Sequence, residues 1–317
     1  MKAAVVRGPD QSPRYEAFAP PESRDGGIIV DVLAAALSPR ARAGATGQHY
    51  TSSGVFPLVP GLDGVGRLPD GQRVYFLAAD DALGTMAERT LADARFALPL
   101  PDGVRASVIA AAMIPAISSW VALTRRAPLQ PRQSVLVLGA TGAAGQLAVQ
   151  IAKYLGAGRV VAAGRNREVL GRLQALGADV VVGLTGTKGD GEAVAAAASE
   201  VDIVLDYLWG PVTTGIMPAL CRLREAESRA LNWVLIGSVA GEDISLSSIL
   251  LRKRNLQILG SGQGATSTAD MFSVSPDIVA AFAAGALQVQ VHEVPLADVE
   301  RQWSTHLASG ERLVFVT

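Results

Sequence analysis

A glycine-rich turn between a predicted strand and a predicted helix decides the fold of this chain. The stretch reads Ser134-Val135-Leu136-Val137-Leu138-Gly139-Ala140-Thr141-Gly142-Ala143-Ala144-Gly145-Gln146-Leu147-Ala148-Val149-Gln150-Ile151-Ala152-Lys153. Three glycines spaced by three follow an apolar strand, and a helical pattern follows them. This order of strand, turn and helix predicts a site for a nucleotide pyrophosphate.

Each glycine of this turn has an expected physical role. Gly139 permits the tight turn, Gly142 lets the backbone approach a phosphate, and Gly145 lets the helix lie close to the strand. The N–H groups at the helix start attract phosphate oxygens. The alternative is a strand–turn–helix that merely uses glycine. A second predicted strand at 159–163, where the motif needs it, favours cofactor binding. The predicted cofactor contacts of the turn are Gly139, Thr141, Gly142, Ala143, Ala144 and Gly145.

The bulk composition is that of an enzyme with two domains. The chain has 317 residues and a formal net charge of −1, with charges of both signs mixed along it. This balance predicts neither a nucleic-acid nor a membrane partner. The longest apolar stretch, 104–123, contains Arg105 and Pro115 and predicts a buried helix rather than a membrane span. The start of the sequence predicts a first strand rather than a signal peptide, so we expect a cytoplasmic protein.

The cysteine and histidine content argues against a metal site. Cys221 is the only cysteine, so no internal disulfide can form. A structural zinc site needs about four clustered Cys or His ligands, whereas His49, His292 and His306 are scattered. We therefore expect no metal. Cys221 lies in an apolar-periodic stretch and is predicted to be a small core residue.

The pattern of predicted elements divides the chain into three parts. Residues 1–117 predict a β-rich domain with strands at 2–7, 27–34, 64–68, 73–77 and 96–99. Residues 118–263 predict a doubly wound parallel sheet with strands at 134–138, 159–163, 179–182, 202–206, 232–236 and 256–260. Residues 264–317 predict a polar loop, a helix at 277–284, a strand at 289–294, a helix at 296–308 and a last strand at 312–316 that returns to the first domain. The fold class is α/β.

Several short motifs follow one another over nearly the whole length. They read Val-Pro-Gly-Leu-Asp-Gly-Val-Gly at 59–66, Gly-Thr-Met-Ala-Glu at 84–88, Leu-Pro-Leu-Pro-Asp-Gly at 98–103, the glycine turn at 139–145, Val-Leu-Asp at 204–206, Val-Leu-Ile-Gly-Ser at 234–238, Leu-Gly-Ser-Gly at 259–262 and Val-Pro-Leu-Ala-Asp-Val at 294–299. In this order the chain resembles a medium-chain dehydrogenase/reductase of the zinc-free quinone oxidoreductase group. The resemblance implies a Rossmann domain at 118–263, a GroES-like β-rich catalytic domain formed by 1–117 and 264–317, and a homodimer joined along strand 256–260.

The resemblance also constrains the reaction. Zinc-dependent members carry Gly-His-Glu where this chain has Gly61-Leu62-Asp63, and leucine cannot bind a metal. Hydride addition to a quinone or an α,β-unsaturated carbonyl needs no Lewis acid, because the negative charge spreads onto a remote oxygen. The expected protein is an NADPH-dependent reductase of quinones or enones that works in an interdomain cleft. The alternative is a non-catalytic NADPH-binding sensor or structural protein on the same fold.

The end of the second predicted strand favours NADPH over NADH. NAD-specific sites place Asp or Glu there, whereas this chain has Gly164, Arg165 and Asn166. Arg165 stands where a 2′-phosphate would lie, and the alternative is a solvated surface arginine. Many quinone reductases carry a Lys and a Tyr further on, which align with Glu168 and Leu184. Arg165, with Asn166 or Arg167, would have to compensate.

The remaining site residues follow from the resemblance. Ser118 aligns with a Thr beside the nicotinamide, and the same region is expected to be lined by Gly237, Ser238, Gly260, Ser261 and Gly262. The loop 38–50 aligns with a loop whose Tyr faces the substrate, although Ser38 and Ala41 replace the family's Asn and Asp. Tyr50 or a protonated His49 is the predicted proton donor, and the alternative is that both only line the cleft. The two aromatic residues in 206–210, Tyr207 and Trp209, either line the cofactor cleft or only pack in the core.

Overall fold

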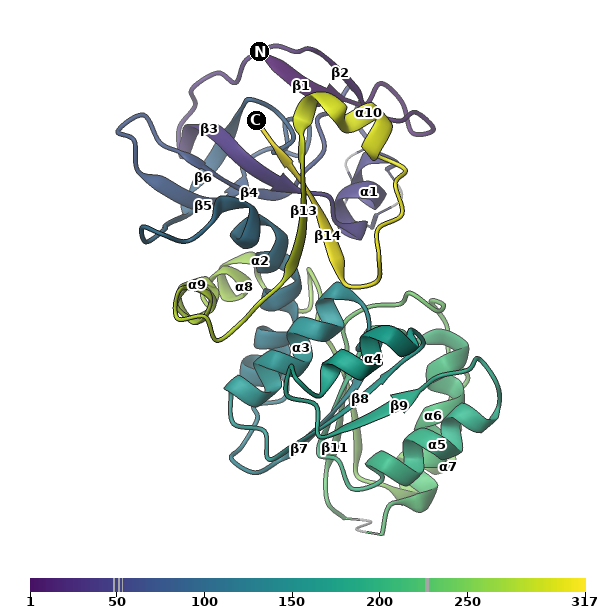
Figure 1. The fold of residues 1–317 in the computed structure, drawn as a ribbon. Coiled ribbons are helices and arrows are strands. Elements are labelled where there is room, and N and C mark those ends of the chain that lie inside the picture. The colour runs from purple at the N-terminus through teal and green to yellow at the C-terminus, as the bar shows by residue number, and fades with distance from the viewer. Residues whose placement is uncertain (48, 51, 53, 226–227) are drawn as a thin grey trace. The chain divides into compact units, whose positions relative to one another are not determined.

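The structure is a computed structural model that describes residues 1–47, 49, 50, 52, 54–225 and 228–317. The chain forms two compact units, Met1–Ile114 with Ser275–Thr317, and Pro115–Val274 (Figure 1). The first boundary, after 114, lies three residues before the expected 117. The second boundary, after 274, lies eleven residues beyond the expected 263.

A small closed barrel forms the centre of the first unit. Strand β3 (Gly27–Ala36) pairs antiparallel with β4 (Asp63–Arg67), and its first half pairs with β6 (Arg89–Pro99). Strand β5 (Arg73–Ala78) joins β4 to β6 and completes the ring. The predicted β-rich, GroES-like domain is therefore confirmed, although β6 begins well before the expected residue 96.

The C-terminal segment extends this sheet. Strand β14 (Glu311–Val316) pairs antiparallel with β3, and β13 (Gln290–Pro295) lies parallel beside β14. The expected return of the last strand to the first domain is confirmed. Strands β1 (Lys2–Val5) and β2 (Arg14–Ala17) form a separate pair, and helix α1 (Pro39–Ala45) follows β3.

The second unit is built on a six-stranded sheet whose described strand pairs are all parallel. The order is β12-β11-β10-β7-β8-β9. The strands are β7 (Ser134–Leu138), β8 (Arg159–Gly164), β9 (Val180–Gly183), β10 (Ile203–Asp206), β11 (Leu231–Leu235) and β12 (Leu256–Gly260). The predicted doubly wound Rossmann sheet is confirmed, and β12 is at its edge as expected.

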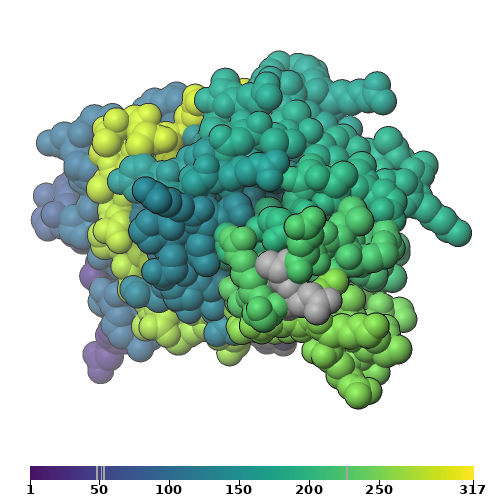
Figure 2. Space-filling view, turned by 90° about the horizontal axis from the view of Figure 1, so that it is seen from below, coloured from purple at the N-terminus to yellow at the C-terminus, as the bar shows by residue number. Residues whose placement is uncertain are grey.

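Helices alternate with these strands and bury the sheet. They are α3 (Ala143–Tyr154), α4 (Arg167–Leu173), α5 (Gly189–Ala198), α6 (Gly210–Leu223) and α7 (Ser248–Lys253), and the short α8 (Thr268–Phe272) follows the last strand. Side chains of α5 and α6 pack against Leu136, Leu138 and Trp233 in one core cluster. Cys221 is fully buried in that cluster, which confirms its predicted core position. Helix α7 and β12 belong to the part of the unit drawn in green in Figure 2.

The apolar stretch near residue 110 is an internal helix. Helix α2 (Ala106–Val121) continues into a π-helical turn (Ala122–Arg126), and together they are long and apolar enough to cross a membrane by composition. However, 78% of the apolar window is buried inside the protein. Most of α2 faces protein rather than solvent, which confirms the predicted buried helix.

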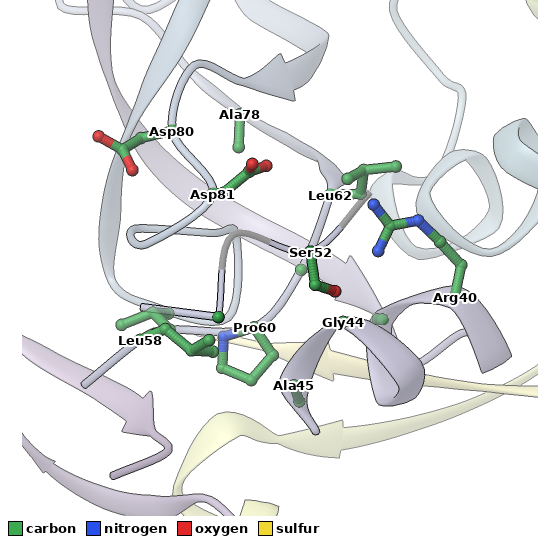
Figure 3. A pocket seen from close by; sticks show the side chains of 14 residues that line it. Arg40, Gly44, Ala45, Ser52, Leu58, Pro60, Leu62, Ala78, Asp80 and Asp81 are labelled. Carbon is green, nitrogen blue, oxygen red and sulfur yellow. The ribbon is translucent and has the colours of Figure 1, made fainter. Parts of the chain in front are cut away.

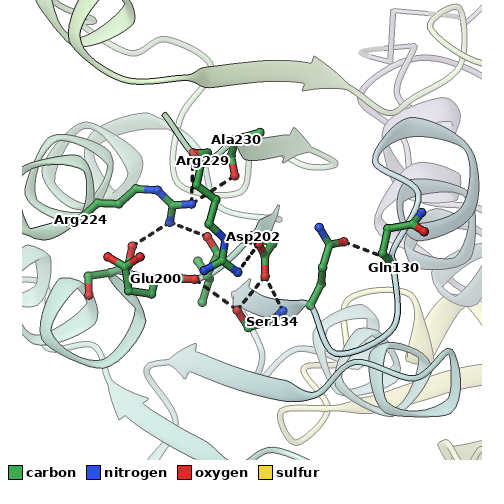
Figure 4. A network of polar contacts seen from close by, with 10 residues as sticks. Gln130, Ser134, Glu200, Asp202, Arg224, Arg229 and Ala230 are labelled. Carbon is green, nitrogen blue, oxygen red and sulfur yellow. Dashed lines mark hydrogen bonds and ion pairs between the residues drawn. The ribbon is translucent and has the colours of Figure 1, made fainter. Parts of the chain in front are cut away.

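A polar network fixes the amino ends of three strands (Figure 4). The buried Asp202 carboxylate accepts from the Ser134 backbone N–H at 2.8 Å and from the Arg229 Nε at 2.8 Å. Arg224 donates to the carbonyls of Val201 at 2.7 Å and Ala230 at 3.2 Å. These groups lie at the amino ends of β7, β10 and β11 and hold the three strands in register with one another. The carboxyl ends of the same strands therefore keep fixed positions relative to one another.

Two local predictions fail, and one strand was not predicted, each for an identifiable reason. The expected loop after 264 contains α8, which begins at a Ser267 cap. The expected helix 296–308 is a 3₁₀ turn, Leu296–Asp298, followed by only Val299–Gln302. Its continuation, Ser304-Thr305-His306, has low helix propensity. Strand β2 has no apolar alternation and exists through its pairing with β1.

Candidate nucleotide-binding site and acceptor loop

The candidate site of the second unit lies where its strand order reverses. Strands β7 and β10 are neighbours in the sheet, and Leu138 at the end of β7 lies opposite Asp206 at the end of β10. The chain winds outward in both directions from this pair. In open α/β sheets, ligands bind at the carboxyl ends of the strands at this point.

The glycine turn after β7 is built as the sequence predicts. Gly139 has φ +88°, and its N–H and that of Ala140 donate to the Ala163 carbonyl, each at 2.9 Å. A Cβ on Gly145 would lie 2.2 Å from the Gly139 carbonyl oxygen. The turn therefore needs glycine at 139 for its conformation and at 145 for close approach of α3 to the strand.

The start of α3 is open to a ligand. Gly142 is its exposed N-cap residue, and within the described chain no side chain caps the first N–H groups of the helix. A Cβ on Gly142 would meet only the Gly139 oxygen, at 3.6 Å. Ala143 and Ala144 are half-buried, while the Thr141 side chain is buried against Gly164. Uncapped N–H groups beside a bare glycine fit the oxygens of a pyrophosphate.

The end of β8 presents arginine at the same edge of the sheet. Gly164 is buried, and Arg165 is exposed with no hydrogen bond or ion pair found among the described residues. The Asn166 side chain caps α4, because its Oδ1 accepts a hydrogen bond from the Val169 N–H at 3.0 Å. Glu168 forms an ion pair with Arg172. Of the groups expected to read a 2′-phosphate, the two guanidinium groups of Arg165 and Arg167 remain available.

The turn after β10 holds a buried carboxylate, the last residue of the Val-Leu-Asp motif, to which the sequence analysis assigned no role. Asp206 accepts from the backbone N–H groups of Leu208 at 2.8 Å and Trp209 at 2.9 Å, and from Trp233 Nε1 at 2.8 Å and Thr213 Oγ1 at 2.5 Å. These bonds hold Trp209 at φ +54°, which is rare for a bulky residue. The signal in the sequence was an aspartate at the end of a predicted strand, directly before Tyr207-Leu208-Trp209.

The two aromatics of this turn have different surroundings. Trp209 packs in the core with α6 and donates to the Glu242 carbonyl at 3.1 Å. The Tyr207 oxygen lies 3.4 Å from the Ser118 oxygen, and Ser118 donates to the Pro115 carbonyl at 2.7 Å. Burial raises the pKa of Tyr207, so its phenol stays protonated. Trp209 therefore packs, and Tyr207 stands beside the serine expected at the nicotinamide.

The last predicted contacts extend along the same edge. The Gly237 N–H donates to the Asp206 carbonyl at 3.1 Å, and a Cβ there would lie 3.1 Å from the Tyr207 oxygen of the backbone. Ser238 is exposed. The Ser261 N–H donates to the Leu235 carbonyl at 2.8 Å, Gly260 accepts from Arg126, and Gly262 follows. The carboxyl ends of β7, β8, β10, β11 and β12 thus bring the predicted residues to one edge.

The loop 38–50, which is predicted to face the hydride acceptor and is called the acceptor loop here, belongs to the first unit. Tyr50 is 73% exposed, and its ring stacks on His49 with centroids 4.3 Å apart. Partial burial and the nearby Arg40 charge lower the pKa of His49, which keeps the ring neutral at pH 7. A protonated His49 is therefore disfavoured as the donor. The catalytic roles of both residues stay predictions, and Gln48 between them and α1 lies outside the described residues.

A pocket opens beside this loop (Figure 3). Its cavity volume is about 50 Å³, and the pocket is open to solvent. Its lining combines α1 and the loop with the segment that follows, and comprises Arg40, Ala41, Gly44, Ala45, Ser52, Gly54, Leu58, Val59, Pro60, Gly61, Leu62, Ala78, Asp80 and Asp81. Leu62 stands at the position where zinc-dependent relatives have histidine. Among the residues that the structure describes, no group of three His, Cys, Asp or Glu could hold a metal.

Next to Leu62, Asp63 is buried in the barrel. Burial raises the pKa of Asp63 to about 7, and the Tyr75 hydroxyl and the Arg312 charge oppose this shift. Tyr75 is fully buried, and its pKa is raised as well. Asp63 points to the interior, so this residue belongs to the stability of the barrel rather than to the pocket lining.

Known proteins resemble this chain in sequence and in fold. No family model matches the chain. A probable NADPH-dependent quinone reductase of Emericella nidulans is 29% identical over 94% of this chain and 93% of its own length. An NADPH-dependent alkenal/one oxidoreductase of Arabidopsis thaliana is 29% identical over 52% of this chain and 47% of its own.

The solved structures agree with these relatives. The quinone oxidoreductase from Thermus thermophilus, also solved in complex with NADPH, has a TM-score of 0.81 and 26% identity, and the match covers 100% of both chains. A putative NADPH:quinone reductase from Bacillus thuringiensis has a TM-score of 0.81 at 21% identity, which speaks to the fold alone. The glycine turn and the barrel agree with these likenesses, and the chain is therefore similar to quinone reductases and quinone oxidoreductases in sequence and in fold.

Proposed function

We propose that the protein is an NADPH-dependent reductase that transfers hydride to quinones or α,β-unsaturated carbonyls. One observation carries the proposal: a relative aligned over 94% of the chain is named a probable NADPH-dependent quinone reductase, and the glycine turn that this activity needs is intact here. The exposed Arg165 at the end of β8 adds a group that fits a 2′-phosphate.

The proposed cofactor contacts follow the edge of the sheet. The N–H groups at the start of α3, with Gly139, Gly142 and Gly145 allowing close approach, hold the pyrophosphate. Arg165 holds the 2′-phosphate, beside Gly164 and Asn166. The nicotinamide side is lined by residues at the ends of α2, β11 and β12, namely Ser118, Gly237, Ser238, Gly260, Ser261 and Gly262.

The chain's own residues position the acceptor and complete its protonation. Bound NADPH supplies the hydride. An enone would gain the hydride at its β-carbon, its oxygen would take up the negative charge, and a proton at the α-carbon would complete the saturated ketone. A quinone that gains the two electrons of the hydride and two protons in all would become the hydroquinone. The exposed Tyr50 hydroxyl is the proposed donor, because the neutral His49 has no proton of comparable acidity to give.

The alternative, a non-catalytic NADPH-binding protein, is separated from the enzyme by one experiment. The protein is mixed with NADPH and a panel of quinones and enones, and NADPH absorbance is followed. We expect turnover of at least one acceptor. Tight binding of NADPH that none of the acceptors oxidises would contradict the reductase and support the non-catalytic NADPH-binding protein.

The proposal includes a homodimer and a cytoplasmic location. Strand β12 is a sheet edge, and α7 beside it in sequence exposes Ile249 at 57% and Leu251 at 46%. An unpaired edge with apolar neighbours favours pairing with a second copy. A chain with one cysteine forms no internal disulfide and so gains nothing from an oxidising compartment.

A further inference from the structure

The pocket of the first unit carries a guanidinium group that lies close against a glycine. Arg40 and Gly44 are one helical turn apart on α1, and a Cβ on Gly44 would lie 2.8 Å from Arg40 Nη1. The bare glycine therefore makes room for the arginine along the pocket wall. In Figure 3 the Arg40 side chain extends from α1 toward Leu62, at the rim of the cavity.

A hydroxyl group stands in the same pocket without a partner. The Ser52 oxygen is buried and has no hydrogen-bond partner among the described atoms, and Ser52 lines the cavity with Arg40. A buried polar atom without a partner is unfavourable, so a ligand oxygen that accepted from it would gain from binding. Arginine donates hydrogen bonds in a fixed fork and stays charged at all ordinary pH values.

The rest of the lining suits a flat apolar body. Leu58, Pro60, Leu62 and Ala78 present no polar side-chain atom to the cavity. One charged fork, one hydroxyl and an apolar wall together fit an aromatic or quinonoid ring that carries an anionic oxygen.

We propose that Arg40, with Ser52, selects acceptors that carry an anionic substituent, such as a sulfonate, a carboxylate or an ionised hydroxyl. The inference rests on the proposed function, since it names the substrate class of that reductase. Arg40 is a specificity residue in this account, and the proton donor remains a separate group.

Two carboxylates, Asp80 and Asp81, line the same pocket as Arg40 and affect how strongly it attracts an anion. Asp80 is engaged with Arg24 at 3.2 Å and with the Ala82 N–H at 2.7 Å. Asp81 is exposed and faces the Arg40 charge, which it stabilises. Asp81 therefore opposes an incoming anion, so its neutralisation should favour anion binding.

The test measures binding to the protein without cofactor, by calorimetry at low ionic strength. The probes are naphthalene-2-sulfonate and its uncharged counterpart, 2-naphthol. We expect the sulfonate to bind the wild type more tightly than the naphthol. Arg40→Ala should weaken sulfonate binding by about tenfold to hundredfold, the loss of a charge-assisted hydrogen bond. It should change naphthol binding far less.

The same helix offers a matched control. The Arg42 guanidinium lies 5.8 Å over the Trp303 ring and does not line the pocket, so Arg42→Ala should leave sulfonate binding unchanged. Asp81→Asn should tighten it by roughly threefold. Gly44→Ala, which displaces Arg40 without removing a charge, should weaken it.

The outcomes separate this proposal from the function on which it rests. Equal binding of both probes to the wild type, or equal losses in Arg40→Ala and Arg42→Ala, would overturn the role of Arg40. If uncharged quinones are still reduced in that case, the reductase assignment stands. If the sulfonate binds through Arg40 and no acceptor of either charge is reduced, the reductase assignment fails and the anion site remains.

Discussion

Arg165 is the single side chain on which the choice of cofactor rests. It is exposed at the end of β8, beside the buried Gly164 and the capping Asn166. The neighbouring acid, Glu168, is paired with Arg172 and does not stand where an NAD-specific carboxylate would. The position thus favours a phosphate over a ribose hydroxyl.

Replacing this arginine should affect one cofactor only. Arg165→Ala should weaken NADPH binding by about tenfold to hundredfold, since a charge-assisted contact contributes about 1.5–3 kcal/mol at low salt. NADH binding and the fold should be retained. Fluorescence titration of both cofactors checks this, with Arg167→Ala as the exposed neighbour. Equal losses for NADPH and NADH would make Arg165 structural, and a loss confined to Arg167→Ala would move the phosphate contact there.

Asp63 should make the stability of the barrel depend on pH. Its pKa is raised from 3.8 to about 7 by burial, so the folded protein holds this proton more tightly than the unfolded chain does. The stabilisation is fully present below pH 3.8 and is lost as the pH rises through 7. In this window the free energy of unfolding should fall by at most about 1.4 kcal/mol per pH unit from this group.

The isosteric variant isolates that contribution. Asp63→Asn cannot ionise, so its stability relative to the wild type should rise from pH 5 to pH 7 and level off above. Urea denaturation at several pH values measures the difference. Parallel curves would show that the Arg312 charge, which opposes the shift, keeps Asp63 ionised throughout.

At the scale of elements, the glycine turn separates packing from ligand binding. Gly145 lies where a Cβ would meet backbone at 2.2 Å, while a Cβ on Gly142 would meet only one atom, at 3.6 Å. The two positions therefore have different reasons to be glycine. One lets α3 lie on β7, and the other leaves space for a phosphate.

Two alanine variants test this division. Gly145→Ala should lower the free energy of unfolding by about 1–3 kcal/mol or more, because backbone must move. Gly142→Ala should fold normally and lose NADPH affinity, because its methyl group occupies the space of the phosphate. Thermal denaturation and NADPH titration are needed for both. A stable Gly145→Ala protein, or a Gly142→Ala protein with normal affinity, would contradict the account.

Elements whose signals lie within a few neighbouring residues could be predicted from the sequence, whereas elements that depend on distant partners could not. The strands of the second unit and the edge position of β12 follow from apolar runs and family order, and they are confirmed. Strand β2 depends on a partner distant in sequence, and the helix after 296 stops where propensity falls. The Asp206 network and the Arg40 pocket are formed by side chains that are distant in the sequence and meet only in the folded chain. No spacing in the sequence could therefore predict them.

At the scale of the whole molecule, the edge of the Rossmann sheet predicts assembly. Light scattering at micromolar concentration should give twice the mass of one chain. Leu251→Asp, which puts a charge on the exposed face of α7, should shift the protein toward the monomer. Tyr154→Asp, at an exposed position on α3, should not. A wild-type monomer, or the same effect from both variants, would rule out this interface.

The central claim is direct hydride transfer from NADPH to a conjugated acceptor. The most direct measurement follows deuterium from NADPH labelled at the pro-R or pro-S position of C4 into the product of an enone. The account predicts one deuterium at the β-carbon from one of the two labelled forms, with the α-carbon proton given by the Tyr50 hydroxyl, which exchanges its proton with solvent. A saturated product without the label from either form, or intact NADPH with every enone and quinone, would contradict it.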